Sequence, residues 1–72
     1  MSIGVILTDD DLMAVRKLYA TRWTADIKNW KERDTPYCIW TVTCPNRNNT
    51  HITESGQSLA DTINKVLDRV QD

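Results

Sequence analysis

The sequence predicts an α+β domain in which one helix precedes a three-stranded antiparallel meander and an amphipathic helix follows it. Three observations predict this order. Apolar residues recur at helical spacing near both ends, apolar and polar residues alternate in the middle, and only two glycines and two prolines interrupt the pattern. The 72 residues are enough for one domain, residues 1–72, without a linker or a repeat.

The N-terminal part of the chain carries the signals of a helix start. Thr8 followed three positions later by Asp11 has the pattern of a capping box, and the three acidic residues 9–11 suit the positive end of a helix dipole. We therefore predict a helix over residues 9–21. The apolar run over residues 3–7 fits a short strand as well, and the sequence leaves open whether this extra element forms.

The apolar residues of this first helix lie three or four positions apart, which places them on one face. They are Leu12, Val15, Tyr19 and Trp23, with Met13 and Leu18 beside them. We predict that this face packs in the core.

From Trp23 to Lys28 the spacing changes to strict alternation, which is the period of a strand. A charged turn from Lys31 to Pro36 ends that strand. Residues 37–44 form the strongest predicted strand, because every one of them is aromatic, β-branched or cysteine. The face expected in the core is that of Cys38, Trp40, Val42 and Cys44.

The opposite face of that strand holds Tyr37, Ile39, Thr41 and Thr43, and we expect it to be partly exposed, together with Trp30. After a polar turn at residues 45–49, a third short strand is predicted over residues 50–54. Ser58, with Asp61 three positions later, predicts the start of the second helix. Its apolar face is Leu59, Ile63, Val66, Leu67 and Val70.

The size of the chain argues against catalysis. A core of this size supplies only about 3–5 kcal/mol of net stability, and a deep substrate pocket would remove packing from it. We therefore expect neither an enzyme nor a small-molecule substrate. No apolar run reaches the roughly 18–20 residues that a membrane span needs, and no export signal is recognisable, so we expect a cytoplasmic protein.

Residues able to bind metal or to catalyse are few, and each has a structural explanation. Cys38 and Cys44 lie too far apart along one strand, roughly 20 Å, to form a disulfide. With His51, the only histidine, they lack the close spacing of zinc ligands. Cys44 and His51 flank one hairpin, so a nucleophile–base pair stays open as an alternative. We expect no metal and no cofactor.

The middle of the chain is basic. Residues 16–33 carry six Lys or Arg and two acidic residues, and aromatic residues are interleaved with them, whereas both ends are acidic. Such a segment can bind a nucleic-acid strand by charge and stacking, or an acidic protein surface. Alternatively Trp23 is core and the lysines are a solvated rim. Trp30, out of phase with Trp23 and Ile27, is the residue we expect to be exposed for binding.

Two stretches carry a resemblance to known families. Residues 22–27, Arg-Trp-Thr-Ala-Asp-Ile, open a strand, and residues 57–63, Gln-Ser-Leu-Ala-Asp-Thr-Ile, open a helix after the meander. This layout resembles that of small phage-encoded inhibitors of bacterial RNA polymerase, and it is also similar to the HicB-like antitoxin domain. The N-terminal helix lies outside both patterns, and no site residue is carried over from either family.

The first resemblance implies a small non-enzymatic regulator that binds and inhibits a bacterial machine, with host RNA polymerase as the partner, in the cytoplasm of the host cell if a phage encodes it. The alternatives are a module that binds single-stranded nucleic acid and an antitoxin-like or anti-defence inhibitor. The predicted partner-binding residues are Arg22, Lys28, Trp30, Lys31, Arg33 and Arg47.

Overall fold

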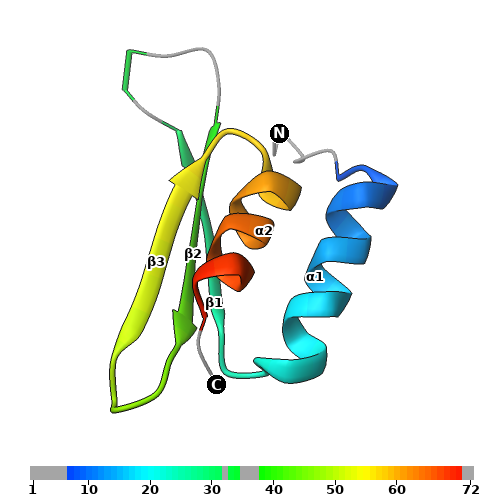
Figure 1. Ribbon diagram of the computed structural model, residues 1–72. Coiled ribbons are helices and arrows are strands. Elements are labelled where there is room, and N and C mark those ends of the chain that lie inside the picture. Colours follow the sequence, from blue (N-terminus) through cyan, green and yellow to red (C-terminus); the bar gives the residue numbers. More distant parts are fainter. Residues whose placement is uncertain (1–6, 32, 35–37, 71–72) are drawn as a thin grey trace.

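The computed structural model describes residues 7–31, 33–34 and 38–70. The elements follow in the order α1 (Asp9–Thr21), β1 (Asp26–Lys31), β2 (Cys38–Pro45), β3 (His51–Gly56) and α2 (Leu59–Arg69). The strands form one antiparallel sheet in the order β1-β2-β3, with both helices on the same side of it (Figure 1). The predicted α+β order is confirmed.

The extra strand suggested at residues 3–7 lies outside the described residues, apart from Leu7, which belongs to no strand. Within the described ranges, no helix is both long and apolar enough to cross a membrane.

Both helices begin at the predicted caps. The Asp11 amide donates to Thr8 Oγ1 at 3.2 Å, and the Thr8 amide donates to Asp11 Oδ2 at 3.0 Å, which completes a capping box. The Ser58 hydroxyl accepts from the Asp61 amide at 3.4 Å. Asp11 also reaches α2, because its Oδ1 accepts from the Ala60 amide at 3.1 Å. One carboxylate therefore joins the beginnings of two helices that run side by side (Figure 1).

The core lies between α2 and the sheet. α2 packs against β2 and β3, and α1 packs against α2. The buried apolar residues come from both helices, from β2 and β3, and from the turn before β1; they are Ala14, Leu18, Ala25, Val42, Cys44, Ile52, Leu59, Ile63 and Val66. The predicted inner faces of β2 and α2 are confirmed, with one exception. Cys38 is exposed, because it is the first residue of β2, at the end of the sheet.

Gly56 allows α2 to approach the sheet closely. A Cβ atom at this position would lie 2.9 Å from Thr62 Oγ1. Thr62 is completely buried, and its hydroxyl donates to the Ser58 carbonyl oxygen at 2.6 Å, so it has little freedom to move. The Glu54–Arg69 ion pair makes a second link between β3 and α2.

The apolar face predicted for α1 is confirmed only in part, at Leu18 in the core and Val15 packed against it. Ala14 and Leu18 are the buried residues of the helix, whereas Leu12 is 44% exposed and Tyr19 is 38% exposed. The reason is that α1 packs against α2 and not directly against the sheet. Its contact with α2 runs along Asp11, Ala14 and Leu18, and Leu12 and Tyr19 are turned away from that contact.

Candidate partner-binding surface

The six residues predicted to bind a partner lie in three places. Arg22 and Arg47 lie together where the end of α1 meets the β2–β3 turn. Lys28 and Trp30 lie on β1, on the face of the sheet that the helices leave open. Lys31 and Arg33 lie at the far end of β1, where the chain turns toward β2. The sequence therefore predicted five cations and one tryptophan that the fold separates into three groups.

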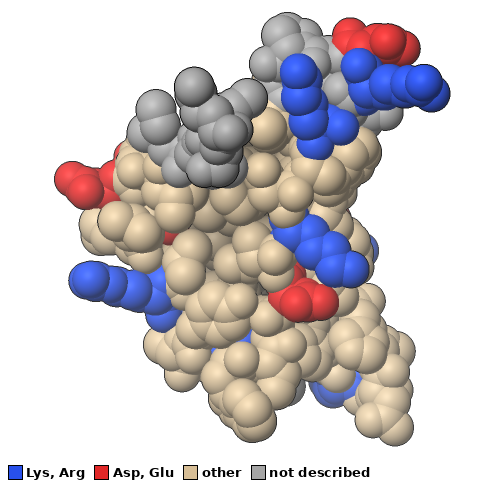
Figure 2. Space-filling view, turned by 180° about the vertical axis from the view of Figure 1, so that it is seen from behind, with Lys and Arg blue, Asp and Glu red and all other residues tan. Residues whose placement is uncertain are grey.

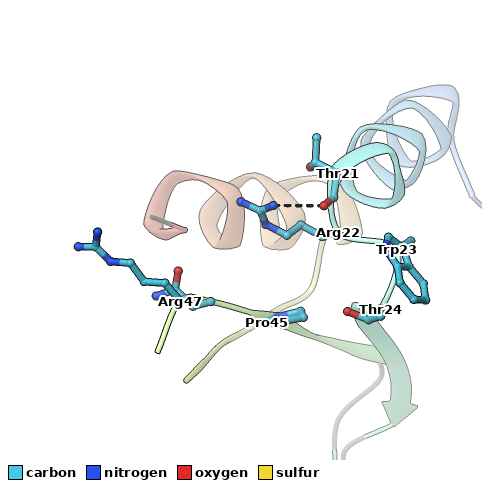
Figure 3. A pocket seen from close by; sticks show the side chains of 7 residues that line it. Thr21, Arg22, Trp23, Thr24, Pro45 and Arg47 are labelled. Atoms are coloured by element: carbon cyan, nitrogen blue, oxygen red, sulfur yellow. Dashed lines mark hydrogen bonds between the residues drawn. The ribbon is translucent and has the colours of Figure 1, made fainter. Parts of the chain in front are cut away.

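The first group borders a concave surface of about 300 Å³, lined by Thr21, Arg22, Trp23, Thr24, Pro45, Asn46 and Arg47. Arg22 is the C-cap of α1, and its Nη1 donates to the Thr21 carbonyl oxygen at 3.1 Å. Figure 3 shows the side chains of Arg22 and Arg47 extending toward the same side of the concavity. Two guanidinium groups so placed favour carboxylates or other anions on a partner.

Trp23 is a functional candidate for which the sequence left two interpretations open, a core position at the start of a strand and a place in a binding segment. It is 79% exposed. β1 begins only at Asp26, since residues 22–25 form a turn in which the Ala25 amide donates to the Arg22 carbonyl oxygen at 2.9 Å. In Figure 3 the indole points away from the two arginine side chains. Trp23 follows the C-cap residue of α1 directly, and this position was the signal in the sequence that it lies in a turn.

The open face of the sheet carries Trp30, as predicted. Its indole is 47% exposed, and its Nε1 donates to Thr41 Oγ1 at 3.3 Å. The Thr41 hydroxyl is in turn hydrogen-bonded to the Ser55 hydroxyl at 3.1 Å, and the Thr43 and Thr53 hydroxyls are 3.2 Å apart. Figure 2 shows much of this side of the molecule as uncharged, with Lys and Arg side chains at one end and others scattered singly over the rest.

In the part of the chain that the structure describes, the residues considered for catalysis or metal binding, Cys38, Cys44 and His51, do not form a cluster. No group of three or more His, Cys, Asp or Glu side chains there is placed to hold a metal ion. Cys44 is buried, whereas Cys38 and His51 are exposed. The backbone amide of Thr8 lowers the pKa of the Asp11 carboxyl, burial opposes this, and the Ala60 amide lowers it further. The lowered pKa therefore results from the hydrogen bonds that Asp11 accepts at the starts of the two helices, and it does not indicate a catalytic role.

Comparison of the chain with protein-family models, with curated proteins and with solved structures finds no match.

Proposed function

We propose that this protein is a small non-enzymatic regulator that binds and inhibits a bacterial macromolecular machine, and that the machine is host RNA polymerase. The layout that resembles phage-encoded polymerase inhibitors supports the choice of partner. The exposed tryptophans and arginines support a binding role, since these residue types dominate the energetics of protein interfaces.

The observation that carries the binding role is the exposure of Trp23. Burying an indole removes more apolar surface from water than burying almost any other side chain, and Trp23 stays exposed in a domain whose own core is small. A second tryptophan, Trp30, is half exposed on another face. Exposed apolar surface of this kind is typical of proteins that bind a partner.

The charges near Trp23 indicate an acidic partner surface. Arg22 and Arg47 come from segments 25 positions apart in sequence, and both border the same concavity. Arginine side chains pair well with carboxylates in two-point contacts. We therefore expect the indole to anchor the contact and the two guanidinium groups to select an acidic surface beside it.

Binding to purified bacterial RNA polymerase tests the proposal. We expect the protein to bind the polymerase with a Kd of about 1 μM or tighter, and to reduce transcription from a promoter in vitro. Trp23→Ala should weaken binding at least about tenfold, whereas Met13→Ala, which removes a 67% exposed apolar side chain from the other side of α1, should not. Lack of binding to the polymerase would contradict the choice of partner. Equal affinities of the two variants would contradict the role of Trp23.

Single-stranded nucleic acid is the second candidate partner, and the two arginines extending to one side of a concave surface favour it. Salt distinguishes the two partners. Binding to phosphates should weaken steeply between about 50 and 200 mM salt, whereas a contact anchored by an indole, with two arginine–carboxylate pairs beside it, should weaken less. A mobility shift of a labelled oligonucleotide at low salt, abolished by Arg47→Ala, would support nucleic acid.

A further inference from the structure

We infer that the outer edge of β1 takes up an extended strand of the partner protein, which lies beneath α1 and adds a fourth strand to the sheet. This inference rests on the proposed function in one respect, that the partner is a protein. It adds the manner of binding.

β1 is an edge strand with an open hydrogen-bonding side. The strand order is β1-β2-β3, and among the described residues the strand pairs only with β2. Its six residues, Asp26–Lys31, are paired in continuous register, without a bulge, a proline or a glycine. An edge of this kind presents a row of free backbone donors and acceptors, which is the template for strand addition. At the other edge, β3 is linked to α2 by the Glu54–Arg69 pair.

The apolar face of α1 that the fold leaves uncovered lies toward the β1 edge. It consists of Leu12 and Tyr19, which are exposed, and Val15, which is half-buried against the core. The Tyr19 hydroxyl donates to the carbonyl oxygen of Ala25, one residue before β1, at 3.1 Å, so this face is turned toward the strand. Figure 1 shows α1 beside α2, and α1 packs against α2 and not against a strand of the sheet. An added strand would therefore be covered by apolar side chains.

These surroundings define the chemistry of the strand. Because side chains alternate between the two faces, one set would meet Leu12 and Tyr19, and the other would lie beside Asp26, Lys28 and Trp30. We therefore expect apolar residues on the first face and, on the second, an acidic residue beside Lys28. A second copy of this chain fits less well, since twofold pairing through β1 would bring its own α1 into the same space.

A synthetic peptide tests the edge without the natural partner. The probe alternates valine with glutamate, and the control alternates valine with lysine. In an antiparallel pair, alternate amides of β1 point toward β2 and the others point toward the free edge. With the glutamate peptide at about ten times its Kd, exchange of the amides in Asp26–Lys31 that point toward the free edge should slow about tenfold, and binding of the lysine peptide should be weaker. Protection of these outward-pointing amides in the free monomer, or a dimer that protects them, would mean that the edge is already occupied and would overturn the inference. So would the absence of any effect at about 5 mM peptide.

Two neighbouring positions on α1 provide a matched pair of variants. Leu12→Glu places a charge on the face above the edge and should weaken peptide binding about tenfold, whereas Met13→Glu, on the other side of the helix, should leave it unchanged. Both positions are exposed, so circular dichroism should show folded variants. If the polymerase binds both variants equally, and the β1 amides that point toward the free edge exchange as fast in that complex as in the free protein, the inference fails and the proposed function stands. If the peptide behaves as expected and the polymerase does not bind, the inference about the β1 edge stands and the proposed function fails.

Discussion

At the scale of single residues, Asp11 has the widest structural role. Its two carboxylate oxygens accept hydrogen bonds from Thr8 and from Ala60, so that it caps α1 and also satisfies an amide in the first turn of α2. One side chain thus links the starts of two helices, although Asp11 and Ala60 lie 49 residues apart in the sequence. The preceding residue, Asp10, also lies at the positive end of the α1 dipole, but it is exposed, and no residue that the structure describes forms a hydrogen bond with its carboxylate.

Asp11→Asn should therefore destabilise the fold by about 1–2 kcal/mol at pH 7. The hydrogen bonds lower the pKa of Asp11 in the folded state, so the stability that they contribute is present above the unfolded pKa and is lost as the pH falls through the folded value. The difference between wild type and variant should shrink below about pH 4. Urea denaturation at several pH values measures it.

Asp10→Asn is the control for this prediction. It removes a carboxylate from the same helix turn without removing a capping bond, and it should cost at most about 0.5–1 kcal/mol. A pH-independent difference for Asp11→Asn, or equal effects of the two variants, would contradict the capping role of Asp11.

At the scale of elements, the position of α1 determines which apolar side chains and which strand edge remain uncovered. Its small residue Ala14 and its buried Leu18 face α2, and its larger residues Leu12 and Tyr19 remain partly in water. A three-stranded sheet beneath α2 does not extend under both helices (Figure 1). The uncovered face of α1 and the free edge of β1 are thus two consequences of the same narrow sheet.

The orientation of α1 can be tested with one substitution made at two sites. Leu18→Val should lower the free energy of unfolding by about 1 kcal/mol more than Leu12→Val, because Leu18 is fully buried and Leu12 is not. Both changes carry the same cost in helix propensity, which cancels in the comparison. Thermal or urea unfolding gives the two values, and a larger loss at Leu12 would mean that the helix is rotated from the orientation described.

At the scale of the whole molecule, the cations predicted to bind a partner do not form one continuous patch. Arg22 and Arg47 lie near the start of β1, and Lys31 and Arg33 lie at its other end. Six strand residues separate the groups by roughly 16 Å. A partner that touches both groups must be large, which agrees better with a protein machine than with a small ligand.

This separation predicts independent contributions to binding. The loss of binding free energy in Arg47→Ala and the loss in the Lys31→Ala, Arg33→Ala double variant should add within about 0.5 kcal/mol when all three changes are combined. Titration calorimetry with the polymerase measures the three values. Strong coupling between the two ends would show that binding rearranges the sheet or joins the groups into one site.

The sequence by itself was sufficient to predict the order of elements, both helix caps, the inner face of β2, the apolar face of α2 and the exposure of Trp30. These features depend on interactions between residues close in sequence, namely side-chain periodicity and capping hydrogen bonds. It did not predict the buried side of α1 or the exposure of Trp23, nor that Arg22 and Arg47 border one concavity. Only the tertiary structure decided these, because they depend on how α1 packs against α2 and on the width of the sheet beneath the two helices.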